Sequence, residues 1–155
     1  MSDLEGKLAA AEARPAASQA AVCLKSPEMA EYYVDEVHDL LLCVLKQART
    51  SYCQDGTRAA ELIDALLAGN ELTGEGKKIF ERLKIILFRN KNITKSDVSD
   101  MEKLGFEVTR NTDNHYHLVF RGDAKYTFAL PSTGSDVKGM KNAYSDIDRQ
   151  LNVCK

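Results

Sequence analysis

The residues with the most evident chemistry are two histidines, His115 and His117, which stand two positions apart. The unperturbed pKa of histidine lies near neutrality, so an imidazole can take a proton from a hydroxyl group or give one to a leaving oxygen. No carboxylate stands at an evident spacing to complete a metal site with this pair, so we expect no metal. The third histidine, His38, stands in an apolar helical run and is expected on a helix surface.

Both histidines belong to three short runs of alternating apolar and polar residues between positions 105 and 130, separated by NTDN and RGDA. Such alternation with turn-rich junctions predicts a three-stranded antiparallel sheet. Because successive side chains of a strand point to opposite sides, one face is apolar and the other carries both histidines. The apolar positions are Phe106, Val108, Tyr116, Leu118, Phe120, Tyr126, Phe128 and Leu130. We expect the aromatic rings among them to be buried in a core rather than to stack on nucleic-acid bases.

Two predicted helices flank this sheet. Thr94 and Asp97 form the pattern of a capping box, and Gly105 stands where a helix would end in the left-handed conformation. Ser135 or Asp136 can cap a last helix, whose apolar residues recur at spacings of four, three and four. Those residues are Met140, Tyr144, Ile147 and Leu151. The order helix, strand, strand, strand, helix is therefore predicted, with both helices on one face of the sheet.

In the first half of the chain, the apolar patterns predict helices and no strands. Residues 1–20 are rich in Ala, Ser and charge and contain few large apolar side chains, which is typical of a flexible tail. Three amphipathic helices follow, from Ser26-Pro27 to about Tyr52, from Thr57 to about Ala68 and from Thr73 to about Phe88. We expect a three-helix bundle over residues 21–89, with a boundary at residues 89–93. The predicted fold class is α+β: this small helical bundle, followed by an α-β-β-β-α domain over residues 94–155.

The composition supports a folded chain with a slightly uneven charge. Of its 155 residues, 44% are hydrophobic, which is enough for a core, and the formal net charge of −2 argues against non-specific coating of nucleic acid. Residues 89–155 carry 11 Lys and Arg against 9 Asp and Glu, and residues 1–88 carry 10 against 14. This asymmetry weakly favours a polyanionic partner for the second half.

The four cysteines, Cys23, Cys43, Cys53 and Cys154, form no CxxC pair and have no histidine at ligand spacing. We interpret them as free thiols and expect a reducing, cytoplasmic location. The N-terminus has no signal-peptide pattern, and no apolar run approaches the length that crosses a membrane, so no membrane partner is expected.

Residues 94–152 resemble the HicA-type toxins, small ribonucleases of bacterial toxin–antitoxin pairs that share the fold of the double-stranded-RNA-binding domain. The resemblance depends on four segments: Leu104-Gly105-Phe106, Val108-Thr109-Arg110, Asn114-His115 leading into Tyr116-His117-Leu118, and Phe128-Ala129-Leu130-Pro131. Residues 1–93 have no part in it.

The resemblance implies a catalytic role for His115, without metal or cofactor. Cations that could stabilise phosphate beside it are Arg110, Arg121, Lys138 and Lys141, and the residues expected to contact nucleic acid are these four and His117. The implied function is an RNA-binding bacterial or phage protein, with ribonuclease activity in a toxin–antitoxin or defence system as its stronger form. The alternative is a non-enzymatic protein-interaction module that regulates or scaffolds a partner complex. Expected partners are RNA, an antitoxin or other protein, and a second copy bound through the N-terminal helices.

Overall fold

The computed structural model describes residues 24, 25, 27–111, 115–131 and 136–154. The predicted tail of residues 1–20 lies outside this range. All the regular elements described here belong to the second of two units of the chain, Glu31–Lys155, which is compact. They are α2 (Glu36–Ser51), α3 (Arg58–Ala68), α4 (Glu75–Arg89), α5 (Lys95–Lys103), β1 (Phe106–Arg110), β2 (Tyr116–Phe120), β3 (Thr127–Leu130) and α6 (Val137–Leu151). The predicted α+β class and the α-β-β-β-α order are confirmed.

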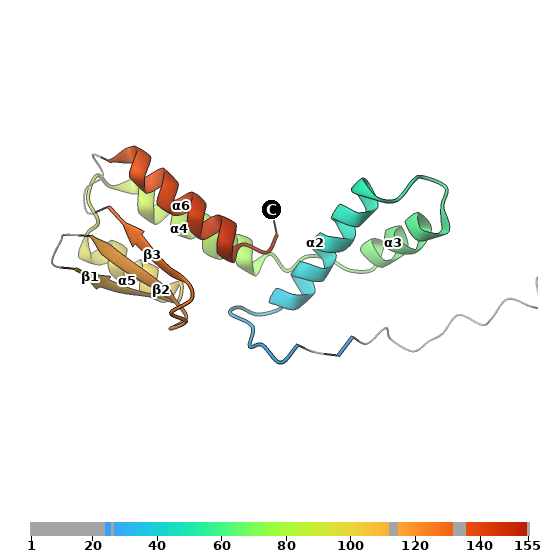
Figure 1. The fold of residues 1–155 in the computed structure, drawn as a ribbon, viewed down its shortest axis with the longest axis horizontal. Helices are drawn as coiled ribbons and strands as arrows, with labels where there is room; N and C mark the ends of the chain where they lie inside the picture. The colour runs from blue at the N-terminus through green and yellow to red at the C-terminus, as the bar shows by residue number, and fades with distance from the viewer. Residues whose placement is uncertain (1–23, 26, 112–114, 132–135, 155) are drawn as a thin grey trace, which may run out of the picture. The chain divides into compact units, whose positions relative to one another are not determined.

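The three strands form one antiparallel sheet in the order β1-β2-β3, as the alternation predicted (Figure 1). Phe106 pairs with Phe120 across β1 and β2, and Tyr116 pairs with Leu130 across β2 and β3. The buried residues of the strands are Phe106, Leu118, Phe120, Phe128 and Leu130, all from the face predicted to be apolar. The turn after β2 uses two left-handed residues, Arg121 and Gly122.

Helices α5 and α6 cover the apolar face of the sheet. Helix α5 packs against β1 and α6 packs against β3, and their buried residues join one core with those of the strands. Gly105 follows α5 with a φ of 96°, a conformation that glycine adopts without steric cost, as predicted for the end of this helix. No helix in the described part of the chain is long and apolar enough to cross a membrane. The cytoplasmic location stays a prediction.

Helix α4 belongs to this same core, which corrects the predicted bundle and its boundary at residues 89–93. Its buried residues are Phe80, Leu83, Ile86 and Leu87, and they pack in the core of the sheet and its helices. Helix α4 contacts both α5 and α6, and the Tyr144 hydroxyl of α6 donates to the Phe80 carbonyl oxygen at 3.4 Å. The amphipathic pattern predicted that α4 buries one face, but a pattern does not specify which surface covers that face.

Helix α2 begins at Glu36, nine residues later than the predicted start at Pro27, and ends beside Tyr52 as expected. The preceding residues are held by two tyrosines instead of a helical turn. The Tyr32 hydroxyl donates to the Asp123 carboxylate at 2.5 Å, and Tyr33 packs so closely on Gly76 that a Cβ there would lie 2.6 Å from its hydroxyl oxygen. These contacts favour a bent entry into α2, with a turn at Val34–Asp35, over the predicted helical one.

Two further connections hold α2 to the rest of the unit. The buried carboxylate of Asp39 accepts hydrogen bonds from the Thr73 amide, the Thr73 hydroxyl and the Gly74 amide at 2.8, 2.9 and 3.0 Å. Cys43 forms a disulfide with Cys154, which follows α6. The prediction of free thiols is therefore wrong for this pair, whose 111-residue separation gave no sign of the contact. Cys53 is a free thiol.

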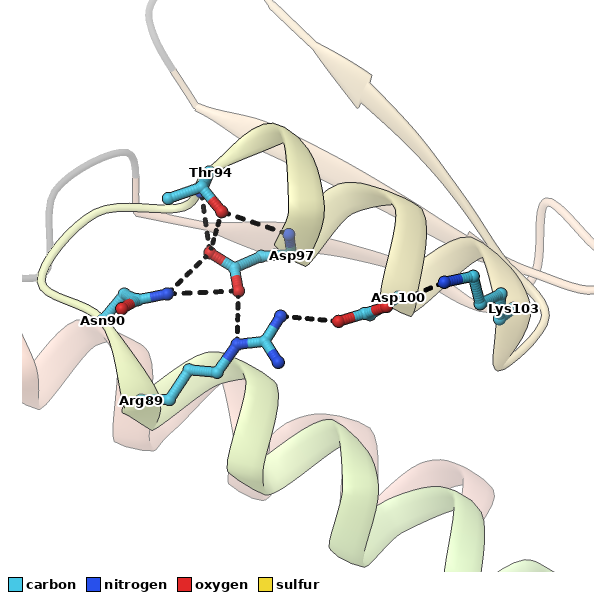
Figure 2. Close-up of polar contacts among 6 residues, drawn as sticks. All are labelled: Arg89, Asn90, Thr94, Asp97, Asp100 and Lys103. Carbon is cyan, nitrogen blue, oxygen red and sulfur yellow. Dashed lines mark hydrogen bonds and ion pairs between the residues drawn. The ribbon is translucent and has the colours of Figure 1, made fainter.

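A second buried carboxylate, Asp97, joins the end of α4 to the start of α5 (Figure 2). It is 1% exposed, and it exchanges the two predicted capping-box hydrogen bonds with Thr94. Arg89 donates to Asp97 and to Asp100, each at 2.6 Å, and the Asn90 amide also donates to Asp97. Burial alone would raise the pKa of Asp97, but the hydrogen bonds from Thr94, Arg89 and Asn90 outweigh it and lower the pKa.

The disulfide should stabilise the fold by closing a long loop in the unfolded chain. Replacing both partners, Cys43→Ser with Cys154→Ser, should lower the free energy of unfolding by about 4 kcal/mol, measured by urea unfolding of the oxidised proteins. Addition of a dithiol reductant should lower the stability of the wild type by a similar amount and leave the double variant unchanged. Cys53→Ser is the control and should behave as the wild type. Equal stability of the wild type and the double variant would contradict a stabilising role of the disulfide.

The Asp97 network should make stability depend on acid. The pKa of Asp97 in the folded protein is below the value of about 3.9 expected in the unfolded chain, so its contribution is complete above that pH and is lost as pH falls through the folded value. Asp97→Asn should cost on the order of 2 kcal/mol at neutral pH and progressively less as the pH falls below about 3.9, in urea unfolding. The control is Asp146→Asn, which removes a surface pair with Arg149. A cost that does not change with pH would contradict this account.

Candidate functional site

His115 and His117 both lie at the start of β2. His115 is exposed and directly precedes the strand, and its carbonyl oxygen accepts a hydrogen bond from the Asn111 amide at 2.9 Å. His117 lies on the outward face of the sheet, between Thr109 of β1 and Ala129 of β3. The residues just before His115, which include Asn114 of the family-like segment, lie outside the described residues.

The ring of His117 is held in place, because the side-chain nitrogen of Asn111 lies 2.8 Å from its Nε2 atom. In this arrangement the amide donates to Nε2, so the neutral ring carries its proton on Nδ1. Of the two histidines, His117 thus has a fixed orientation, whereas His115 stands exposed beside it. The sequence showed the spacing of the two rings but not this difference between them.

Arg110 lies at the same end of the sheet but on the other face. It is the last residue of β1, pairs with Tyr116, and places its guanidinium carbon 5.6 Å from the centre of the Tyr116 ring. Since the pairing puts Arg110 on the side of Tyr116, it lies across the sheet from His117. Arg110 and His117 therefore do not share a face of the sheet.

A cleft of about 410 Å³ opens beside Arg110, between the start of α5 and the adjoining ends of β1 and β2. Its walls are formed by Ile93, Lys95, Val98, Val108, Arg110 and Tyr116. The Tyr116 hydroxyl donates to the Ile93 carbonyl oxygen at 3.5 Å, which connects the segment before α5 to the sheet. Two cations and an aromatic ring thus share one cleft.

Lys138 and Lys141 are exposed on the first turns of α6, as predicted. Asp136 caps this helix by accepting a hydrogen bond from the Gly139 amide at 2.7 Å. Because Leu130 pairs with Tyr116 and only six residues separate it from α6, the helix begins at the same end of the sheet as His115 (Figure 1). The N-terminus of a helix carries a partial positive charge that adds to that of the lysines.

We call this end of the unit the basic end and define it by six residues: Lys91, Lys95, Arg110, His115, Lys138 and Lys141. All six side chains are exposed. Lys91 and Lys95 were not predicted as binding residues, although the basic junction RNKNI was visible in the sequence. Their relation to the sheet depends on the contact between Ile93 and Tyr116, which the sequence pattern did not reveal.

Arg121 does not belong to the basic end. It follows β2 at the opposite end of the sheet, with a left-handed φ of 52°. Its amide donates to the Gly105 carbonyl oxygen at 2.8 Å, and its guanidinium carbon lies 5.8 Å from the centre of the Phe120 ring. Arg121 is therefore placed in the turn near the end of α5, away from the other predicted nucleic-acid contacts.

The part of the chain that the structure describes contains no group of three or more His, Cys, Asp or Glu side chains that could hold a metal ion. The arrangement at the basic end offers exposed cations, one exposed imidazole and a ring-lined cleft. These groups can bind phosphate, stack on a base and exchange a proton. No family model, no curated protein and no solved structure matches the chain.

Proposed function

We propose that this protein binds RNA through the basic end of its α-β-β-β-α unit. The observation that carries the proposal is the position of Lys95, Arg110 and the first turns of α6 at one end of the sheet, where the cleft lies. The fold class agrees with the resemblance to HicA-type toxins, which implied RNA as the ligand.

The electrostatics of the basic end favour a polyanion. Two carboxylates in the described part of this region are engaged: Asp97 is buried against Arg89, and Asp136 caps α6. Neither of these two competes with phosphate for the exposed lysines, and lysine contacts to phosphate supply most of the sequence-independent affinity.

The cleft adds a contact that distinguishes RNA from a simple polyanion. The exposed Arg110 guanidinium lies over the half-buried ring of Tyr116, which packs on the core. Guanidinium planes are among the surfaces on which unstacked bases of single-stranded RNA are bound. We therefore expect preference for RNA with a loop or an unpaired end over a fully paired duplex.

The test of binding uses a fluorescently labelled RNA hairpin and anisotropy at several salt concentrations. Lys138→Gln with Lys141→Gln should weaken binding and reduce the slope of log affinity against log salt by about 2, because each lost phosphate contact contributes about one. Lys125→Gln is the matched control, since Lys125 lies at the opposite end of β2, in the turn after it. Absence of RNA binding by the wild type at low salt would refute the proposal.

The stronger form of the proposal is cleavage of RNA by His115. Its exposed imidazole would take the proton from a ribose 2′-hydroxyl, whose oxygen then attacks the adjacent phosphorus. The bond from phosphorus to the 5′-oxygen breaks, and that oxygen takes up a proton, leaving a cyclic phosphate. Lysines at the start of α6 would stabilise the charge that develops on the phosphate oxygens.

His115→Ala should abolish cleavage of a labelled RNA, seen on a denaturing gel, while its RNA affinity stays within about twofold of the wild type, because general base catalysis contributes about 10²-fold to 10⁴-fold in rate. His117→Ala is the control and should retain cleavage, since Asn111 already occupies its Nε2 atom. Cleavage should persist in a metal chelator. Cleavage by His115→Ala at the wild-type rate would exclude this role and leave RNA binding alone.

A second function class is favoured by a different observation. Helices α2 and α3 expose several large apolar side chains, which is typical of a surface that binds another protein. The protein would then act as a non-enzymatic interaction module. The RNA experiment separates the two classes, because this class predicts no dependence on Lys138 or Lys141.

A further inference from the structure

The hairpin of α2 and α3 has one uncovered apolar side. Five of its large apolar side chains are between 38% and 54% exposed, whereas only Asp39, Leu42 and Ala60 of the two helices are buried. The exposed residues are Leu40, Leu41, Val44, Leu62 and Leu66. Among the described elements, α3 has its extensive contacts with α2 alone. Two helices cannot surround a core by themselves, so their apolar residues are only partly covered.

Helix geometry places Leu41, Val44, Leu62 and Leu66 on the same side of the hairpin, and Leu40 at the outer edge of α2, opposite α3. Successive residues of an α-helix rotate by about 100°. In α2, Val44 lies a little over a third of a turn from Arg49, which reaches α3 through its ion pair with Asp64. In α3, the more buried side is formed by Ala60, Ile63 and Leu67. Leu62 and Leu66 are rotated from that side by about a third of a turn, in the same sense in which Val44 is rotated from Arg49. The two helices run antiparallel (Figure 1), so similar rotations in the same sense turn both apolar stripes to one side.

We call this surface the hairpin face, defined by Leu40, Leu41, Val44, Leu62 and Leu66. We propose that the hairpin face packs against the same face of a second copy of this chain, so that two hairpins form a four-helix bundle. The dimer would be isologous, with each residue of the face meeting residues of the partner's identical face around a two-fold axis.

The size of the hairpin face suits such a dimer. Helix α2 has 16 residues and α3 has 11, so they are about 24 Å and 16 Å long, and each helix is about 10 Å wide. The face thus covers on the order of 400 Å² on each copy, or about 800 Å² in total, which is at the low end of the sizes of specific interfaces. None of its five residues is charged, so pairing it with itself leaves no charge buried without a partner.

Elsewhere in the described chain, the exposed large apolar side chains are scattered over several segments: Leu24, Met29, Val34, Tyr52, Leu72, Ile85, Phe88 and Val137. The buried stripes of α4 and α6 are occupied in the core of the sheet. An identical face on a second copy therefore offers a more continuous apolar complement than these scattered residues.

This dimer does not depend on RNA binding. Asp39 and the disulfide connect α2 to the residues before α4 and after α6, whereas the basic end lies at the other ends of these two helices. Since α4 has 15 residues, about 22 Å separate its two ends. A bundle formed by the hairpin faces would therefore leave both basic ends accessible.

The experiment is light scattering after size exclusion, over a hundredfold range of loading concentration. The wild type should have twice the monomer mass of 17.2 kDa, and Leu41→Glu with Leu66→Glu should be a monomer with an unchanged helical circular dichroism spectrum. Ile85→Glu is the matched control, because Ile85 is an exposed apolar residue of α4 outside the hairpin face, and it should remain a dimer. A wild type that is monomeric at every concentration, or a double variant as dimeric as the wild type, overturns the proposal.

A second measurement covers the case in which the double variant does not fold. Val44→Lys and Val44→Glu, each a single change at an exposed position, should each weaken the dimer, because a charge on the face is then buried without a partner. Two folded single variants that are both as dimeric as the wild type overturn the proposal. The monomeric variants should retain the RNA affinity of the wild type if the basic end binds RNA, so each proposal can fail without the other.

Discussion

The buried carboxylate of Asp97 is the contact on which the arrangement of the second compact unit depends. It accepts hydrogen bonds from Thr94 at the start of α5 and from Arg89 and Asn90 at the end of α4. These bonds fix the start of α5 relative to the end of α4. That geometry directs α4 onto the core of the sheet and brings the segment before α5 against Tyr116. Without it, the basic end would not be assembled, because Lys91 and Lys95 lie in and beside this junction.

The elements that depend on local patterns could be predicted from the sequence. The strands, the capping box of Thr94 and Asp97, and the end of α5 at Gly105 each follow from spacing or from the conformational freedom of one residue. The partners of amphipathic faces could not be predicted in the same way. The apolar stripe of α4 is evident in the sequence, but whether α2 or the sheet covers it is decided by contacts between distant residues.

The same distinction holds for the candidate site. The alternation of β2 predicted that His117 faces away from the core, and the start of α6 was predicted to present Lys138 and Lys141. Arg121 was grouped with them because it shares the polar pattern, yet the antiparallel register separates the two ends of β2. The hydrogen bond from Asn111 to His117 and the cleft at Arg110 arise where strands meet across the sheet, and no single segment encodes them.

The disulfide between Cys43 and Cys154 also has a mechanical consequence. It closes a covalent ring of 111-residue span that contains α3, α4, α5, the whole sheet and α6. A pulling force applied at the two ends of the chain first acts on the contacts of Tyr32 and Tyr33, which precede the ring, and then passes from Cys43 directly to Cys154. A translocating motor that grips either end would have to carry this ring as a folded loop or wait for its reduction. The core of the sheet is thereby shielded from forces that act on the termini.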